Sequence, residues 1–478
     1  MKFTLSWLKE HLETTASLTE ITDALTMVGL ELEGVEDRAK GLETFVTAKV
    51  IEAKPHPNAD RLRVCTVDPG NGETVELVCG APNARTGMVG VFAPGGSYIP
   101  GTGITLKPTE IRGVTSNGML LSEREMGISE EHDGIVDLDP TTPVGKPAID
   151  VMGLNNPIID IAITPNRGDC LGVRGVARDL AAAGLGTLKP LANGPVPGAF
   201  KSSIDVKLDF DADHASACPY FVGRLIKGVS NGESPGWLKE KLIAIGLRPI
   251  STLVDITNLL TFDLNRPLHV FDADKVSGDL HVRLSKSGET LQALNDKEYT
   301  LDDEMTVIAD DNGAEALGGV MGGEVSGVTA ETVNVFVESA FFDPTRTAMT
   351  GRKLNLLSDA RYRFERGIDP AFLETGMEVA TRLILDLCGG EPSELVIAGG
   401  NPLQGRAITF RPARVRELTG IDISSDEIQR ILSVLGFVVS GSGDTWDVAV
   451  PSWRSDIEME ACLVEEVVRI NGFDKIPA

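Results

Sequence analysis

The stretch VTAKVIEAKPHPNADRLRVCTVDPGNGETVELVCG, residues 46–80, decides the first part of the fold. It holds three short runs rich in β-branched residues, which the turn-forming segments HPNAD and PGNG separate. Runs punctuated in this way are typical of successive antiparallel strands. Because the same texture continues from about residue 45 to 150, we predict a small barrel of the oligonucleotide-binding kind.

Helical patterns lie on both sides of this barrel. Apolar residues between 18 and 28 recur at helical spacing until Gly29 interrupts them, and VRGVARDLAAAG, residues 173–184, carries an apolar face of the same period. The Pro- and Gly-rich stretch at 188–198 is typical of a linker. We therefore expect amphipathic helices before and after the barrel, with a boundary after the second.

The rest of the chain divides into a mixed region and a C-terminal module. Residues 200–400 alternate strand-like and helix-like runs. Beyond them, Ser424 to Glu427 form a capping box before an apolar helix face that Gly436 ends, and a hairpin pattern and a second amphipathic helix follow. The predicted fold class is α+β and multidomain: an oligonucleotide-binding β-barrel, a mixed α/β domain and a winged-helix-like module.

Bulk properties narrow the class of protein. The net charge is −26 over 478 residues, which argues against a large nucleic-acid interface, although a local basic patch remains compatible with it. The six cysteines are scattered without a CxxC pair, as in reduced intracellular proteins. The N-terminus lacks the pattern of a signal peptide, and no apolar run reaches membrane-spanning length. We expect a cytoplasmic protein with no membrane partner.

Two stretches favour contact with phosphate groups, each beside a plainer interpretation. GGVMGG, residues 318–323, lacks the Lys that follows a P-loop, so a tight turn is favoured over a phosphate cradle. The segment 346–367 carries six basic residues against two acidic ones. A solvated charged face and a phosphate-binding surface are equally compatible with that balance.

One histidine and two groups of carboxylates are the candidates for chemistry. His269, in RPLHVFDAD, is a metal ligand, a general base or a packed turn residue, and the absence of a second His at ligand spacing makes zinc the weakest of these. Glu338 interrupts the apolar run NVFVESAFF, so it either faces solvent or enters a buried site. Asp456, Glu465 and Glu466 collect near one helix end, which suits Mg²⁺.

Many of these stretches together resemble one family, the beta subunit of bacterial phenylalanyl-tRNA synthetase. They occur in the family's order and cover nearly the whole chain. The matching segments are MKFTLSWLKE, HPNADRLRVC, VCGAPN, SNGMLLSE, ITPNRGDCLGVRGVARDL, RPISTLVDITN, RPLHVFDADK, GGVMGGEVSGVT, VESAFFDP, SDARYRFERGIDP, PSWRSDIE and LVEEVVRINGFDKIP. Any one of them is modest evidence, and the set is highly specific.

The resemblance implies a division into domains. Residues 1–38 and 152–190 resemble a discontinuous N-terminal α+β module, into which a tRNA-binding barrel at 39–151 is inserted. Residues 200–400 resemble the B3/B4 editing domain, and 401–478 resemble the B5 domain. Beta subunits of this family continue into a catalytic-like and an anticodon-binding domain, which no part of this chain resembles.

The resemblance also implies a function. The family's alpha subunit activates phenylalanine with ATP and charges tRNA(Phe), so we expect this chain to support that reaction in an α2β2 heterotetramer, with ATP bound on the alpha subunit. Its own chemistry is expected to be hydrolysis of tyrosine wrongly joined to tRNA(Phe). The implied substrate-binding residues are Arg248, His269, Gly319, Gly322, Glu338 and Ala360. Thr257 and Asn258 are the implied catalytic residues, which would position the attacking water.

The resemblance extends to a metal and shows two departures. The family's B5 domain holds a Mg²⁺ shared with the alpha subunit, and three of its four acidic ligands match Asp456, Glu465 and Glu466. Cys462 stands at the fourth position, and a thiol is a poor Mg²⁺ ligand. Asn265 and Arg266 replace the Gly-Gln pair common in the family, which alters the rim of the expected editing pocket.

Two rival functions stay open at this point. The first is a non-enzymatic module for tRNA docking and subunit assembly whose editing pocket is inactive, which the two departures motivate. The second is a free metallohydrolase that uses HVFDAD, although that segment has no second cluster of ligands.

Overall fold

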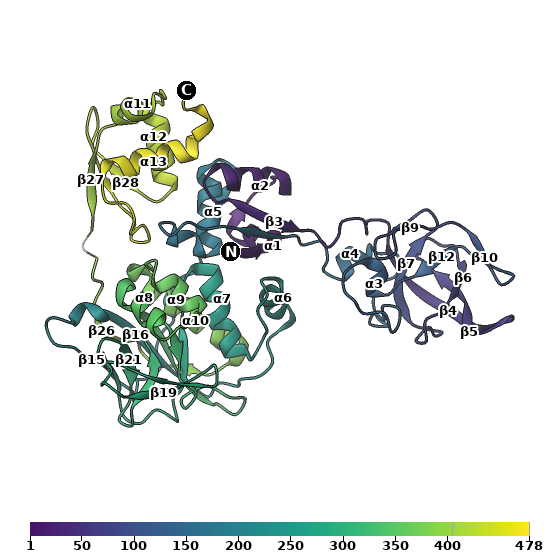
Figure 1. The fold of residues 1–478 in the computed structure, drawn as a ribbon, viewed down its shortest axis with the longest axis horizontal. Helices are drawn as coiled ribbons and strands as arrows, with labels where there is room; N and C mark the ends of the chain where they lie inside the picture. The colour runs from purple at the N-terminus through teal and green to yellow at the C-terminus, as the bar shows by residue number, and fades with distance from the viewer. Residues whose placement is uncertain (404, 478) are drawn as a thin grey trace. The chain divides into compact units, whose positions relative to one another are not determined.

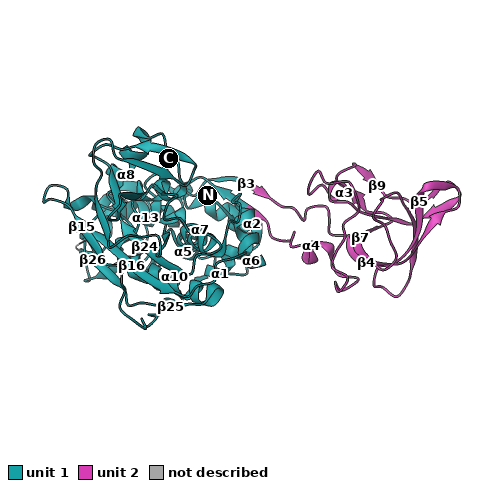
Figure 2. Ribbon diagram, turned by 90° about the horizontal axis from the view of Figure 1, so that it is seen from below, with its two compact units in different colours: residues 1–34, 159–478 teal, residues 35–158 magenta. Residues whose placement is uncertain are grey.

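The structure is a computed structural model that describes residues 1–403 and 405–477. The chain forms two compact units, which Figure 2 shows in different colours. The insert unit consists of residues 35–158, and the main unit consists of residues 1–34 together with the chain from 159 onward. The barrel predicted at 39–151 thus falls inside the insert unit.

The insert unit is built on five antiparallel strands. Its elements are β4 (Val46–His56), β5 (Ala59–Asp68), β6 (Val75–Cys79), β7 (Val89–Pro94), β8 (Tyr98–Ile99), β9 (Ile104–Thr105), β10 (Thr109–Ile111), β11 (Val114–Ser116), β12 (Gly118–Leu120), α3 (Glu123–Met126) and α4 (Ala148–Val151). The main sheet has the order β12-β7-β4-β5-β6. Alternate residues, among them Val50, Cys65 and Val67, face one core. The three strands predicted within residues 46–80 are therefore confirmed, and so is the barrel-like fold.

The N-terminal module of the main unit combines helices with short strands. Its elements are β1 (Lys2–Thr4), α1 (Leu5–His11), β2 (Leu12–Glu13), α2 (Leu18–Met27), β3 (Leu32–Glu36), β13 (Ile158–Ile161), a 3-10 turn at Gly168–Leu171, α5 (Val173–Ala182) and β14 (Thr187–Leu188). The helices predicted around 18–28 and 173–184 are confirmed as α2 and α5. The helical pattern of the first residues gave no sign of β1 and β3, which join β13 in a three-stranded sheet. Their partner lies beyond the insert, so no local pattern marks them.

The mixed region contains two five-stranded sheets and a layer of helices. Its strands are β15 (Val206–Asp209), β16 (Tyr220–Lys227), β17 (His269–Asp272), β18 (Leu280–Leu284), β19 (Thr290–Ala293), β20 (Lys297–Thr300), β21 (Thr306–Ala309), β22 (Ala314–Leu317), β23 (Met321–Gly322), β24 (Asn334–Phe341), β25 (Glu391–Pro392) and β26 (Val396–Gly399). Its helices are α6 (Gly236–Ala244), α7 (Thr252–Leu264), α8 (Pro344–Lys353), α9 (Asp359–Phe364) and α10 (Leu373–Cys388), with 3-10 turns at Ala215–Ala217 and Pro370–Phe372.

The central sheet of this region has a different hydrophobic core on each of its two faces. It runs β17-β24-β16-β25, with β26 also paired to β16, while the second sheet runs β15-β18-β21-β22-β23. Val335 and Val337 of β24 face the core shared with α7 and α10, which lie together on one side of the strands (Figure 1). Phe336 and Ala340 face the opposite way, into the core shared with the second sheet. Glu338 is in phase with this second set.

The C-terminal module has the winged-helix-like composition that was predicted. Its elements are β27 (Ala407–Phe410), α11 (Ala413–Thr419), α12 (Ser425–Val434), β28 (Val438–Ser440), β29 (Trp446–Ala449), α13 (Glu460–Asn471) and a 3-10 turn at Phe473–Lys475. The strands form one antiparallel sheet, β27-β29-β28. The capping box forms only in half: Ser424 accepts the backbone N–H of Glu427, but the Glu427 carboxylate pairs with Arg430 instead.

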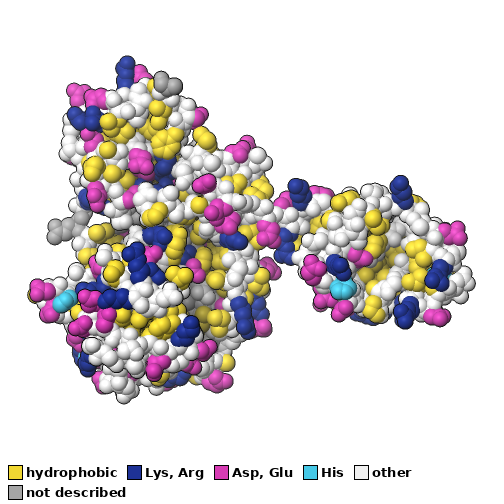
Figure 3. Space-filling view, viewed as in Figure 1, with side chains coloured by type: hydrophobic (Ala, Val, Ile, Leu, Met, Phe, Trp, Pro, Cys, Tyr) yellow, Lys and Arg dark blue, Asp and Glu magenta, His cyan; other side chains and the backbone are white. Residues whose placement is uncertain are grey.

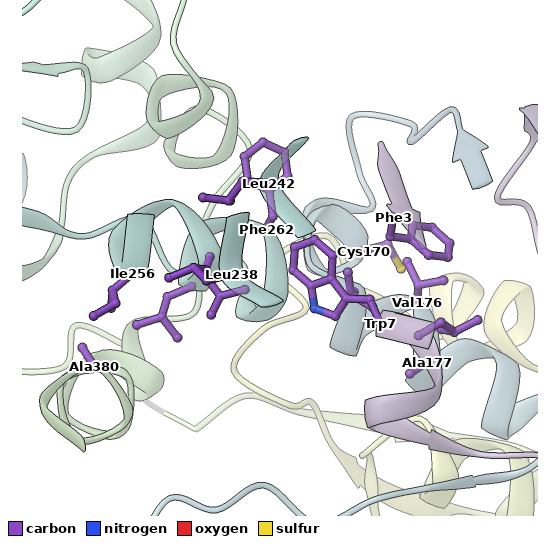
Figure 4. Packing of buried hydrophobic residues seen from close by; sticks show 14 of the residues in the cluster. Phe3, Trp7, Cys170, Val176, Ala177, Leu238, Leu242, Ile256, Phe262 and Ala380 are labelled. Atoms are coloured by element: carbon purple, nitrogen blue, oxygen red, sulfur yellow. The ribbon is translucent and has the colours of Figure 1, made fainter. Parts of the chain in front are cut away.

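One hydrophobic core joins the N-terminal module to the helices of the mixed region. Trp7 of α1 lies beside Phe262 of α7 on one side and near Val176 of α5 on the other (Figure 4), and its indole N–H donates to Asp263 at 2.6 Å. On the face of the molecule that Figure 3 shows, acidic and basic side chains are interspersed. Within the described chain, no helix is both long and apolar enough to span a membrane.

Candidate functional site

His269 and Glu338 lie directly opposite each other on neighbouring strands. β17 and β24 pair antiparallel, and the register places His269 against Glu338. Residues opposite each other in such a pair point to the same face, with their Cβ atoms about 4.5–5.5 Å apart. The strand beyond Glu338 contributes Gly223, which has no side chain on that face. Two residues 69 positions apart in the sequence thus share one patch between the two sheets.

Glu338 is a buried carboxyl group without a hydrogen-bonded partner in the described structure. Its side chain is 6% exposed and shares its face with Phe336 and Ala340. Burial raises the pKa of Glu338 to about 8, and the positive charge of Arg266 opposes that rise only in part. At neutral pH the group is therefore largely a neutral acid, which both donates and accepts a hydrogen bond.

His269 is likewise kept neutral and incompletely bonded. Burial lowers the pKa of His269 to about 4, so the ring carries no charge at neutral pH. Its Nε2 is closed to solvent and has no partner among the described residues. The ring packs edge-on against Phe271, with 4.5 Å between the centroids. An unpaired ring nitrogen beside an unpaired carboxyl group is costly for folding and points to a ligand that satisfies both.

The glycines of GGVMGG make room for this imidazole. A Cβ built on Gly322 of β23 would lie 2.3 Å from His269 Cε1, so any side chain there would displace the ring. Gly319 adopts φ +71°, a backbone conformation that side chains disfavour, and its missing Cβ faces Phe342 and Phe364. The interpretation of this stretch as a close-approach turn rather than a phosphate cradle fits both positions.

The other implied site residues lie on different elements. Thr257 and Asn258 are half-buried on α7, where the Thr257 hydroxyl donates to the Val254 carbonyl and the Asn258 amide makes no hydrogen bond with the described residues. Arg248 is exposed in the loop before α7, and Ala360 is half-buried on α9. No hydrogen bond within residues 1–403 and 405–477 joins any of these four to His269 or Glu338.

The aspartates of RPLHVFDAD have local structural roles. Asp272 accepts the Thr332 hydroxyl at 2.7 Å, and Asp274 accepts the Asn334 amide at 3.0 Å. Among the described residues, no group of metal-ligating side chains forms around them. The geometry gives no support to the metallohydrolase interpretation.

The basic segment 346–367 is mostly used inside the protein. Arg361 and Arg363 are buried and donate to the backbone carbonyls of Leu356 and Leu171. Lys353 pairs with Asp302 and Glu304. The segment therefore offers less free positive charge than its composition indicates. Arg352 is exposed, and its side chain makes no hydrogen bond or ion pair with the described residues.

The three carboxylates expected to bind Mg²⁺ do not converge in the described structure. Both oxygens of Asp456 accept from Arg454 at 2.8 Å. Glu466 is buried between Arg454 and Arg469, which hold the pKa of this carboxyl at about 2 although burial opposes them. Glu465, one position earlier on α13, is exposed. Two of the three are thus already neutralised by guanidinium groups, a donor set that does not fit a divalent cation.

These side chains belong to a larger arginine–carboxylate cluster that bridges the N-terminal and C-terminal modules. Its members are Arg167, Asp169, Asp179, Arg454, Asp456, Glu466 and Arg469. Asp179 of α5 receives Arg167 at 2.9 Å and Arg469 of α13 at 2.7 Å. Every charge in the cluster has an opposite charge in hydrogen-bond contact, which is what makes burial tolerable.

One part of this cluster resembles a metal site by its ligand types. Asp169, Cys170 and Asp179 bring their ligand atoms within 4.8 Å of one another. Arg167 donates to all three, so a guanidinium already lies among these atoms. Burial also raises the pKa of the Cys170 thiol, which keeps it from acting as a thiolate ligand.

The arginines of this cluster were missed at the level of sequence, although a signal existed. Arg167 and Arg454 each lie two residues before an aspartate, in RGD and RSD, and each binds that aspartate through two parallel hydrogen bonds. Such a local fork sequesters the carboxylate. Arg266 was noticed only as a departure from a family pattern, yet it is the charge that opposes the high pKa of Glu338.

Three families match successive parts of the chain. The "Putative tRNA binding domain" matches residues 45–147, the "B3/4 domain" matches 217–389, and the "tRNA synthetase B5 domain" matches 408–473. The first falls in the insert unit, the second in the two-sheet region with His269 and Glu338, and the third in the C-terminal module. Together with the fold, they make the chain similar to multidomain proteins that combine tRNA-binding and tRNA synthetase domains.

Curated relatives make the assignment specific. The chain is 58% identical over its whole length to the phenylalanine–tRNA ligase beta subunit of Paramagnetospirillum magneticum and 54% identical to that of Rhodopseudomonas palustris. It spans about 60% of the length of these relatives. By sequence, the chain is therefore similar over its whole length to part of the phenylalanine–tRNA ligase beta subunits, the family that its motifs resemble.

One solved structure aligns along almost the whole chain. An N-terminal fragment of the phenylalanyl-tRNA synthetase beta subunit from Pyrococcus horikoshii covers 98% of it, at 13% identity and a TM-score of 0.43. That likeness is too weak to add to the sequence evidence.

Proposed function

We propose that the chain acts as the beta subunit of a phenylalanine–tRNA ligase and hydrolyses mischarged Tyr-tRNA(Phe) at the His269–Glu338 site. The observation that carries the editing proposal is the pair of buried, neutral and unsatisfied groups on adjacent strands. The family match to the B3/4 domain supports the same region. Aminoacylation itself, with ATP and Mg²⁺, is proposed for the complex with an alpha subunit in an α2β2 heterotetramer.

The two groups suit a phenol hydroxyl. A tyrosine OH donates one hydrogen bond and accepts others, so it can serve His269 Nε2 and the Glu338 carboxyl group together. A phenylalanine ring would leave both groups without a hydrogen-bond partner and would keep water from reaching them. Sites that read a hydroxyl in this way reject the analogue lacking it by about 10⁴–10⁵, which corresponds to roughly 6–7 kcal/mol.

The hydrolytic step needs a positioned water rather than a strong nucleophile. The water oxygen attacks the ester carbonyl, the bond to the terminal ribose oxygen breaks, and the proton passes to that oxygen. The Asn258 amide is free to hold the water, and the Thr257 oxygen keeps a lone pair for it while its hydrogen is donated to Val254. Arg248 is exposed and suits a phosphate near the 3′ end of the tRNA.

The test is a deacylation assay with Tyr-tRNA(Phe) and Phe-tRNA(Phe), run with and without the alpha subunit. Wild type should hydrolyse the tyrosyl ester and spare the phenylalanyl ester. Glu338→Ala and His269→Ala should each lose that preference by about two orders of magnitude or more. Glu298→Ala, at an exposed strand position of the same region, is the matched control and should behave as wild type.

Two outcomes decide against this assignment. If both site variants stay folded and keep the preference for tyrosine, the role of His269 and Glu338 is refuted. If wild type binds tRNA normally but deacylates neither ester, the chain is a docking and assembly module with an inactive site. Such a ligase would work in the cytoplasm, and its tRNA contact would involve the insert unit that matches a tRNA-binding domain.

A further inference from the structure

A second candidate site is lined by residues other than His269 and Glu338, and Arg266, whose charge acts on Glu338, is part of its wall. A cavity of about 460 Å³ in the main unit is lined by α5, the end of α7, the turn before α10 and Trp453 of the C-terminal module. Its volume lies within the range of small-molecule sites, about 300–1,000 Å³. Three arginines line it, Arg174, Arg178 and Arg266, in a chain whose net charge is −26.

Arg178 is free to bind a ligand. Its side chain makes no hydrogen bond with the described residues, and its closest carboxylate, Asp169, is 3.8 Å away and already held by Arg167 through two hydrogen bonds. The guanidinium lies 4.2 Å from the Trp453 ring centroid. Contact with an aromatic face orients a guanidinium without using its in-plane N–H groups, which therefore stay available to an oxyanion.

Arg266 adds a second unsatisfied cation. It is 1% exposed, its Nε and Nη2 donate to the carbonyls of Pro267 and Ala340, and its Nη1 has no partner among the described residues. Burial lowers the pKa of Arg266 to about 10, as expected for a charge with incomplete compensation. A buried arginine of this kind is costly unless an anion approaches it.

The remaining lining groups leave an excess of positive charge. Among the described residues, the acidic side chains that line the cavity are Asp169 and Asp369, and Asp169 is occupied by Arg167. Asp369 accepts the backbone N–H of Ala371 at 2.9 Å and is the single carboxyl group left to face three arginines. Trp453 Nε1 and Asn265 Oδ1 also lack partners in the described structure, so a ligand would meet a further donor and acceptor.

We propose that this cavity binds a small molecule that carries a phosphate or diphosphate group. A doubly charged oxyanion matches the number of unmatched arginines and accepts from their planar forks. The surrounding segments come from separate parts of the sequence, so the site exists only when the modules of the main unit are assembled. Neither His269 nor Glu338 lines the cavity, and Arg266 links it to them through its charge on Glu338.

The proposal is tested by calorimetric titration of the purified chain with inorganic pyrophosphate. Wild type should show saturable binding at one site. Arg178→Met should weaken it about tenfold or more, because one charge-assisted contact is lost. Arg174→Met is the second variant, in case Arg178→Met does not fold, and it should weaken binding as well. Arg352→Met removes an exposed arginine elsewhere and should leave the affinity unchanged.

Three results would overturn it. They are the absence of saturable heat with wild type, an unchanged affinity in both folded cavity variants, and an equal loss in Arg352→Met, which would indicate diffuse charge attraction. A parallel titration with tRNA separates the two sources of phosphate. If Arg178→Met weakens tRNA binding while pyrophosphate never binds, the site serves RNA and the small-molecule assignment fails.

Discussion

The His269–Glu338 site and the arginine–carboxylate cluster both bury ionisable side chains, and they do so in opposite ways. In the cluster, each carboxylate is in contact with a guanidinium, and the pKa of Glu466 falls to about 2 because Arg469 and Arg454 outweigh its burial. At the His269–Glu338 site, Arg266 compensates for the burial of Glu338 only in part and no charge compensates for that of His269, so Glu338 has a pKa of about 8 and His269 one of about 4. Satisfied buried charge holds modules together, whereas unsatisfied buried polarity indicates a place for a ligand.

The largest expected effect comes from breaking the cluster. Asp179→Ala leaves Arg167 and Arg469 buried without their shared partner, so we expect the free energy of unfolding of the main unit to fall by about 3–5 kcal/mol. Urea-induced unfolding followed by circular dichroism measures it. Glu233→Ala removes a carboxylate that is 88% exposed and pairs with Lys239, and it should cost no more than about 1 kcal/mol. Equal costs for the two variants would show that the cluster does not stabilise the fold.

A smaller effect sharpens the other half of the comparison. Because the pKa of Glu338 is raised to about 8 in the folded chain, its contribution to stability is present below about pH 4.5 and is lost as the pH rises toward 8. Glu338→Gln has no such titration. Between pH 6.5 and 8, wild type should therefore lose about 2 kcal/mol relative to Glu338→Gln.

The pKa of His269 is shifted in the opposite direction to that of Glu338, so there is a pH range in which only Glu338 changes the stability. Its lowered pKa makes its contribution present above about pH 6.5 and lost as the pH falls through 4, the reverse of Glu338. The window from pH 6.5 to 8 is thus governed by Glu338, and urea unfolding at several pH values across it provides the measurement. Parallel stability curves for wild type and Glu338→Gln would mean that Glu338 is not buried as a neutral acid.

The smallest expected effect concerns metal. Since Arg454 and Arg469 already neutralise Asp456 and Glu466, chelation of divalent cations should change the stability of the chain by less than about 0.5 kcal/mol. A structural cation present at 100 times its Kd would instead contribute about 2.7 kcal/mol. Thermal unfolding measured with and without EDTA distinguishes these two expected changes in stability. The interpretation as a metal site would be supported if the melting temperature fell on chelation and recovered on addition of Mg²⁺, and if neither change occurred in the Asp456→Asn variant.

Much of the fold could be predicted because its signals are local. The spacing of apolar residues around Ile21 and Val176 identifies α2 and α5, and turn residues at Pro57 and Gly70 separate the barrel strands. β1 and β3 were not predicted, because strands this short can be recognised only together with their partner strand. That partner, β13, lies more than 100 residues further along the chain. Local patterns report secondary structure and say little about distant pairing.

The candidate site shows the same limit. An isolated glutamate in an apolar strand was noticeable, but only the register of β17 against β24 places His269 opposite it. The metal interpretation counted carboxylates within one short segment. It left out Arg454 in that segment and Asp179, which is more than 270 residues away in the sequence and neutralises Arg469 in the same cluster.

The small sheet that holds the insert unit has a consequence for how such a chain can change over time. Ala162 N–H donates to the Glu31 carbonyl at 2.8 Å, so β13 runs back alongside β3, and the chain leaves and re-enters the main unit at the same end of neighbouring strands. A tight turn between these strands would close the same gap with little distortion. We therefore expect that recombination can gain, lose or exchange the whole barrel while the rest of the chain keeps its sheet intact.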